Sequence, residues 1–171
     1  YYSRYRRRRL SWESWRDSLL VAAGTLTLDS RGGPGVDPLD PGNGTKRTLY
    51  SWIDRQDIPG ILRAFDIDNP DTAVLVRPVT LVPQQGLVML NSPLVVDAAK
   101  KVASRLPDES DIPARIEQLW KIVFARSPRV DEIHMVQAWL ERAADSPSGD
   151  FGVWPQIAQA LISTAEFQYY D

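Results

Sequence analysis

Eight polar residues of the sequence have side chains suited to acid–base chemistry or to binding a polar ligand. Carboxylates can donate and accept protons, while arginines and amides can hold an anionic or polar substrate in place. The set that we consider as one polar cluster is Glu13, Arg16, Asp17, Arg47, Asp66, Arg77, Gln85 and Asn91. Networks of partly buried ion pairs and amides are more common than active sites of this composition, so the favoured interpretation is structural.

The residue counts exclude several kinds of site. The 171 residues include no Cys and a single His, His134. Without Cys there is no thiolate zinc site, iron–sulfur cluster, disulfide, cysteine nucleophile or covalent attachment point for haem. His134 follows Asp131 and Glu132 near the start of a predicted helix, which is typical of a solvated or capping side chain. We therefore expect no cofactor in this chain.

Two acidic stretches suggest calcium, because hard cations prefer carboxylate and amide oxygens. They are Asp66-x-Asp68-Asn69-x-Asp71 and, as the weaker candidate, the group Asp37, Asp40 and Asn43. The first does not fit an EF-hand loop, since Asp71 stands where that loop needs Gly. Turns that cap the neighbouring backbone are the favoured interpretation.

Charge is distributed unevenly along the chain. The whole chain has 20 Lys and Arg against 22 Asp and Glu. Residues 1–9 carry five Arg and no acid, which leaves 15 positive and 22 negative charges, a net of −7, for the rest. This basic start, interleaved with three Tyr, could bind nucleic acid through phosphates and stacking. Because the rest is acidic and has no nucleic-acid motif, we favour an approach to the first helix that pairs with acidic groups on an upstream segment, and no nucleic-acid partner.

Hydrophobic periodicity predicts the elements that position these residues. The apolar residues Trp12, Trp15 and Leu19 recur at helical spacing and indicate a helix from near Arg9 to Gly24. Its polar face carries Glu13, Arg16 and Asp17. On that face the spacing predicts ion pairs from Glu13 to Arg9 and to Arg16. The Gly- and Pro-rich residues 29–46 predict a long loop, residues 47–53 a short strand, and residues 60–65 a turn of helix.

From residue 83 onward the pattern is helical. It predicts a short helix over 83–90, a second after the Asn91-Ser92-Pro93 cap, and three amphipathic helices that follow. The predicted fold is therefore mainly α: an irregular helical bundle with a C-terminal antiparallel helix cluster, the long loop, and at most one or two short strands. We divide it into residues 1–28, a loop-rich region 29–82 and a helical cluster 83–171. No apolar run reaches the about 20 residues of a membrane span.

Short sequence words along the chain carry a family resemblance. They are Arg7-Arg8-Arg9-Leu10, Glu13 with Arg16-Asp17, Leu19-Leu20, Gly24, Gly32-Gly33-Pro34, Arg47 with Leu49-Tyr50, Phe65-Asp66, Arg77, Pro83-Gln84-Gln85, Leu90-Asn91-Ser92-Pro93, Arg126-Ser127-Pro128 with Glu132, and Glu166-Phe167. In this order they resemble a planctomycete-type domain of unknown function, the family numbered fifteen-fifty-three. The resemblance implies that residues 1–171 form the C-terminal part of that domain.

The resemblance also implies a setting for the chain. Such domains are found at the end of large exported bacterial proteins, often downstream of a c-type cytochrome domain. The implied location is therefore periplasmic or exported, the implied partners are upstream domains of the same polypeptide, and a c-type haem would be bound elsewhere in that polypeptide. No catalytic residue is established for the family, so the resemblance assigns none here.

The sequence favours a non-catalytic structural or interaction module of a larger protein. One alternative is part of a redox-linked or carbohydrate-degrading enzyme whose site is completed by residues outside this chain. The other is a calcium- or glycan-binding accessory domain that uses residues 29–46. Whether the eight polar residues meet in a cleft or are buried and paired separates these hypotheses.

Overall fold

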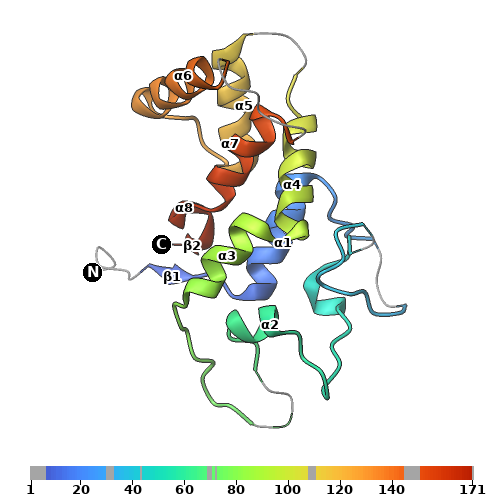
Figure 1. Cartoon of the computed structure of the whole chain (residues 1–171). Helices are drawn as coiled ribbons and strands as arrows, with labels where there is room; N and C mark the ends of the chain where they lie inside the picture. The colour runs from blue at the N-terminus through green and yellow to red at the C-terminus, as the bar shows by residue number, and fades with distance from the viewer. Residues whose placement is uncertain are drawn as a thin grey trace, which may run out of the picture.

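The fold is mainly helical, as predicted (Figure 1). The computed structural model describes residues 7–29, 33–42, 44–68, 71, 73–107, 111–144 and 151–170. The helices are α1 (Trp12–Ala23), α2 (Gly60–Ala64), α3 (Pro83–Asn91), α4 (Pro93–Ser104), α5 (Ile112–Phe124), α6 (Val130–Ala144), α7 (Val153–Ile162) and α8 (Ala165–Gln168), with a 3-10 turn η1 (Thr48–Tyr50). Two short strands, β1 (Arg8–Arg9) and β2 (Tyr169–Tyr170), complete the described elements.

Helix α1 starts and stops where its sequence provides the signals. Ser11 caps the start, since its hydroxyl accepts a hydrogen bond from the Ser14 backbone N–H at 3.3 Å. Gly24 ends the helix in the left-handed region, at φ 70°, which glycine adopts without steric cost. The apolar face buries Trp12 and Trp15 against Phe65, with ring centroids 5.0 and 5.6 Å from the Phe65 ring. This aromatic cluster fixes α1 beside α2.

Helix α4 lies at the centre of the core. It packs against α1 on one side and α7 on the other (Figure 1). Four of its residues, Val95, Ala98, Ala99 and Val102, are buried in the core. Because the two alanines are small, they let the helices approach closely, so α4 links the N-terminal part of the chain to the C-terminal helices.

Residues 47–53 do not form the predicted strand. Thr48–Tyr50 instead makes the 3-10 turn η1, in which the Ser51 N–H donates to the Thr48 carbonyl at 3.0 Å. The pairing in this region, among the described residues, is limited to isolated parallel bridges, Thr27 with Lys46 and Val36 with Ser51. The prediction was wrong because the backbone N–H of Thr48 is bound by a side chain of α1, which removes it from any strand ladder.

The two strands pair with each other and bring both ends of the described chain together. They run antiparallel, with Arg8 opposite Tyr170 and Arg9 opposite Tyr169. The N–H of Leu10 extends the contact to the Gln168 carbonyl, at 2.8 Å. In the described parts of the chain, no helix combines the length and the apolar composition that a bilayer span requires.

Candidate functional site

Arg16 is an anchor for the Gly- and Pro-rich loop. Its side chain is completely buried, although the sequence placed it on the polar face of α1. The guanidinium donates hydrogen bonds to three loop carbonyls, those of Pro38 (2.7 Å), Gly44 (2.5 Å) and Lys46 (3.1 Å), and to the Thr48 hydroxyl (3.1 Å). Burial lowers the pKa of Arg16, against the attraction of nearby carboxylates. The loop thus wraps around one charged side chain.

Asp17 holds the end of the same loop. One carboxylate oxygen accepts from both the backbone N–H and the hydroxyl of Thr48, each at 2.7 Å. The other accepts from Arg47 Nε at 3.1 Å. Asp17 and Arg47 also line a shallow pocket of about 360 Å³ between α1, α5 and α8. Both oxygens of the Asp17 carboxylate are engaged, so this group is used as a loop anchor.

Arg77 joins α1 to the segment that precedes α3. Its Nη1 donates to both carboxylate oxygens of Glu13, at 3.0 and 2.9 Å, and its Nε donates to Asp68 at 2.9 Å. Each of the three side chains is about one-third exposed. The predicted pairs of Glu13 with Arg9 and with Arg16 are therefore wrong: Glu13 pairs with a residue 64 positions away. Helical spacing shows which residues are neighbours on α1 but not what the rest of the chain places beside them.

Gln85 and Asp66 make a second set of contacts to this segment. The Gln85 amide donates to the carbonyls of Ala64 (2.6 Å) and Thr80 (3.1 Å), and its oxygen accepts from Arg9 at 2.8 Å. Asp66 accepts from the Thr80 backbone N–H at 2.9 Å and from its hydroxyl at 2.5 Å. Arg9, part of the basic start, is thereby used inside the fold; residues 1–6 of that start lie outside the described residues.

The eight candidate residues do not meet in one cleft. Arg16, Asp17 and Arg47 form one group at the Gly- and Pro-rich loop, while Glu13 and Arg77 belong to another. Asp66 and Gln85 contact the segment before α3 at Thr80. Asn91 stands apart, because its amide donates to the Leu87 carbonyl of its own helix at 3.0 Å.

The acidic stretches considered for calcium are engaged in contacts within the chain. Asp66 and Asp68 bind Thr80 and Arg77, as described above. Asp37 and Asp40 each accept from the N–H two residues further on, at 2.8 Å, which closes short turns. Asn43 and Asn69 lie outside the described residues. Among the residues that are described, no group of three or more His, Cys, Asp or Glu side chains could hold a metal ion.

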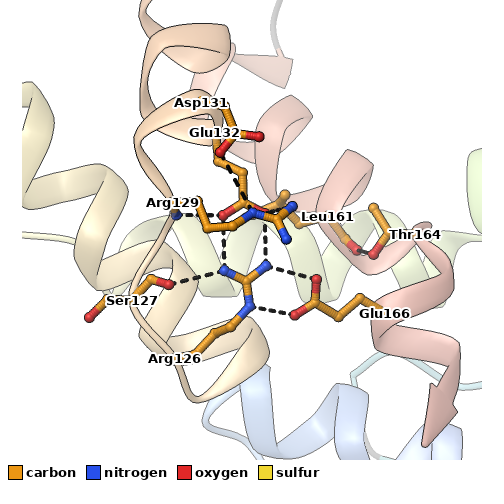
Figure 2. A network of polar contacts seen from close by, with 8 residues as sticks. All are labelled: Arg126, Ser127, Arg129, Asp131, Glu132, Leu161, Thr164 and Glu166. Carbon is orange, nitrogen blue, oxygen red and sulfur yellow. Dashed lines mark hydrogen bonds and ion pairs between the residues drawn. The ribbon is translucent and has the colours of Figure 1, made fainter.

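A different network, centred on Arg126, was not selected as a site from the sequence (Figure 2). Arg126 makes a bidentate pair with Glu132, at 2.9 and 2.8 Å, and a second pair with Glu166, at 2.6 and 2.8 Å. Its remaining N–H donates to the Ser127 carbonyl at 3.0 Å. All five guanidinium donors are used, so the network joins the end of α5 to the start of α6 and to α8.

The network also shifts the pKa of its members. Hydrogen bonds from Arg126 lower the pKa of Glu132 to about 2 and the pKa of Glu166 in the same direction. The two carboxylates in turn raise the pKa of Arg126. Glu132 further accepts from the Arg129 backbone N–H at 2.7 Å, which caps α6. Every charge is compensated, which is the pattern of a structural clamp.

The sequence contained one signal for this network. Arg126, Glu132 and Glu166 were among the residues that carried the family resemblance, although the last lies 40 positions from the first. An apolar pocket of about 330 Å³ lies beside the clamp, between α5, α6 and α7. It is lined mainly by apolar side chains, among them Trp120, Met135 and Trp139. Because its single carboxylate, Glu132, is bound by arginines, the pocket offers apolar contact and no free acid or base.

Comparison with known proteins assigns the family. A family model described as "PSD1: Protein of unknown function (DUF1553)" matches residues 1–140. The chain belongs to the PSD1 family. The predicted resemblance to family fifteen-fifty-three is therefore confirmed, and the match covers the loop anchors, Arg126 and Glu132. No curated protein and no solved structure gives a significant match.

Proposed function

We propose that this PSD1 chain is a non-catalytic module that docks to other domains of a larger exported bacterial protein. One observation carries the proposal. The candidate acid–base groups are occupied by contacts within the chain, and several of those contacts fix an apolar segment that faces solvent. Such an arrangement suits a surface that binds a partner and performs no reaction.

The exposed segment consists of residues 74–81, between α2 and α3. Its large apolar side chains are all exposed: Leu75 is 104% exposed, Val76 81%, Leu81 74%, Val79 70% and Val74 47%. The backbone from Ala73 to Val76 makes no hydrogen bond to any described residue. Exposed apolar surface of this kind is typical of a protein interaction site.

Polar contacts hold residues 74–81 in place from beneath. Arg77, in the middle, is bound by Glu13 and Asp68. Thr80, near the end, is bound by Asp66 through its N–H and by Arg9 through its carbonyl, at 2.9 and 2.6 Å. A segment fixed in this way loses little conformational entropy when it binds, which favours docking.

We infer that the partner is another domain of the same polypeptide. The family resemblance supports this inference, since related domains stand at the end of multidomain exported proteins. A c-type haem, in that setting, would belong to the other domain, because this chain has no Cys for covalent attachment. The module would position the neighbouring domain, and any reaction would take place in that domain.

Hydrogen exchange tests the docking surface directly. Amide exchange over residues 74–81 is compared between this chain alone and the longer natural polypeptide. We expect clear protection of these amides in the longer protein, while amides 54–57 exchange equally in both. Equal exchange over residues 74–81 would contradict the proposal.

A charged variant completes that experiment. Leu75→Asp combined with Val79→Asp changes only side chains that face solvent, so the melting temperature of the isolated chain should stay unchanged. In the longer polypeptide the same variant should lose the protection of residues 74–81. Retained protection would show that this surface is not the contact.

A further inference from the structure

Two arginines stand apart from all others in the described part of the chain. Of its 13 arginines, 11 make a hydrogen bond, an ion pair or a contact with an aromatic ring. Arg55 and Arg63 make none with any described residue. Both are exposed.

These two arginines line the same pocket. Its volume is about 290 Å³, and its other lining residues are Ile58, Ile67 and Asp71. Arg63 stands on the last turn of α2, and Arg55 on the segment that leads into that helix. The volume is close to the lower end of the roughly 300–1,000 Å³ that small-molecule sites occupy. The fold therefore brings two cationic side chains, neither paired with a described residue, to one small pocket.

The pocket has a net positive charge. Two guanidiniums line it with a single carboxylate, that of Asp71, which has an interaction of its own, so the positive charges outnumber the negative ones. Ile58 is only 7% exposed and supplies an apolar wall. Water is a weaker competitor for hydrogen bonds beside such a wall, which strengthens the attraction between a guanidinium and an anion.

The geometry points to a binding site for a tetrahedral oxyanion, a sulfate or phosphate group carried by a small molecule. Guanidinium groups present forked donors that match the oxygens of such groups, and two of them can neutralise a divalent anion. This site is separate from the docking segment at residues 74–81 and does not depend on the proposed function.

Calorimetric titration of this chain tests the site. The probes are inorganic sulfate, inorganic phosphate, methyl sulfate and methyl phosphate, each at the same ionic strength set with sodium chloride. We expect saturable binding of at least one probe, and the comparison of the two esters distinguishes a sulfate ligand from a phosphate ligand. Absence of saturable binding for all four probes at tens of millimolar would overturn the proposal.

Three variants locate the binding. Arg55→Gln and Arg63→Gln should each weaken the affinity roughly tenfold, the amount expected for losing hydrogen bonds to a charged group. The matched control is Arg142→Gln on α6, whose guanidinium donates to the Ala138 carbonyl of its own helix. The control should bind as the natural chain does. An equal loss in all three variants would show general charge attraction and would overturn the site.

The variants are expected to fold, because the altered side chains are exposed and surface substitutions of this kind change stability little. Unchanged circular dichroism and melting temperature verify this. Amide chemical shifts provide a second measurement: sulfate or phosphate should move the resonances of residues 55–71. Shifts confined to other parts of the chain would contradict the assignment.

Discussion

Arg16 and Arg126 both hold distant segments of the chain together, but they bind different kinds of partner. Each arginine joins segments that are far apart in the sequence, and each uses most of its donors. Arg16 is completely buried and bonds to neutral oxygens, three loop carbonyls and one hydroxyl. Arg126 is 31% exposed and bonds mainly to two carboxylates, Glu132 and Glu166.

The difference appears in the pKa of each group. Burial among neutral oxygens lowers the pKa of Arg16, whereas ion pairs raise the pKa of Arg126. Arg16 donates to neutral oxygens and is attracted only secondarily by the carboxylates of Asp17 and Asp37, so its loop contacts should respond to acid less than the Arg126 clamp does. The Arg126 clamp depends on carboxylates and should weaken when they take up protons. The loop around Arg16 is thus held by buried hydrogen bonds to neutral oxygens, and the junction of α5, α6 and α8 is held by ion pairs.

The largest effect should come from Arg16→Met. Methionine fills part of the space but leaves three loop carbonyls, two of them in buried contacts, and the Thr48 hydroxyl without their donor, so we expect a loss of about 3–5 kcal/mol in the free energy of unfolding. Urea denaturation followed by tryptophan fluorescence measures it. Most of the loss should remain at pH 4, because the lost hydrogen bonds go to neutral oxygens. A loss below about 1 kcal/mol would show that the loop does not depend on this anchor.

Gly44→Ala tests the same anchor from the side of the loop. A Cβ atom at residue 44 would lie 2.6 Å from the Asp40 carbonyl oxygen and 2.7 Å from Arg16 Nη2, both too close for any real contact. The loop must shift, and we expect a loss of about 2–3 kcal/mol, smaller than for Arg16→Met because the guanidinium can keep other bonds. Gly60→Ala is the matched control, since a Cβ there meets nothing within 4 Å. Similar effects of the two variants on the urea midpoint would contradict the prediction.

The two arginines also show how far the sequence could predict this fold. Helical periodicity predicted α1 and its end at Gly24, because a helix needs only local signals. It placed Arg16 on the polar face and did not predict its complete burial, since the loop that covers it lies 22 to 32 positions away and its Gly and Pro residues give no periodic signal. Pairing between β1 and β2 was equally invisible, as two residues are too short for an alternating pattern.

The candidate site shows the same limit. The sequence selected residues of the right chemical type, and seven of the eight have long-range partners in the structure. Which side chains would pair could not be predicted: Glu13 was expected to pair within α1 and instead binds Arg77. Arg55 and Arg63 were not singled out at all, because only the surroundings of an arginine in the fold show whether a partner lies within its reach.

Glu132→Gln tests the region held by charge. The amide side chain would keep the size of the natural one but lose the bidentate ion pair, and Arg126 would still have Glu166, so we expect a loss of about 1–2 kcal/mol at pH 7. The matched control is Glu117→Gln, which removes only the exposed pair with Lys121 on α5 and should cost a few tenths of a kcal/mol. An equal cost for both variants in thermal denaturation would show that the clamp contributes no more than a surface pair.

The dependence on pH sharpens this test. The pKa of Glu132 is lowered from about 4.5 to about 2, so the stability it contributes is present in full above pH 4.5 and is lost as the pH falls towards 2. The difference between the natural chain and Glu132→Gln should therefore shrink over that interval, and by a larger fraction than the difference for Arg16→Met. A parallel fall of both differences would mean that the contrast between the two arginines is wrong.

The smallest effect should come from Arg47→Gln, although Arg47 belongs to the polar cluster chosen from the sequence. Its side chain is 55% exposed and gives Asp17 only one of three hydrogen bonds, at 3.1 Å, while the backbone N–H and hydroxyl of Thr48 supply two shorter ones. Water can replace an exposed donor, so we expect a change of less than about 0.5 kcal/mol in urea denaturation, and one that salt reduces further. Asp17→Asn provides the contrast, because it alters the partly buried acceptor of Thr48 and should cost more than about 1 kcal/mol. A larger loss for Arg47→Gln than for Asp17→Asn would contradict the prediction, because it would show that the ion pair with Arg47 holds the loop more strongly than the contacts of Asp17 with Thr48 do.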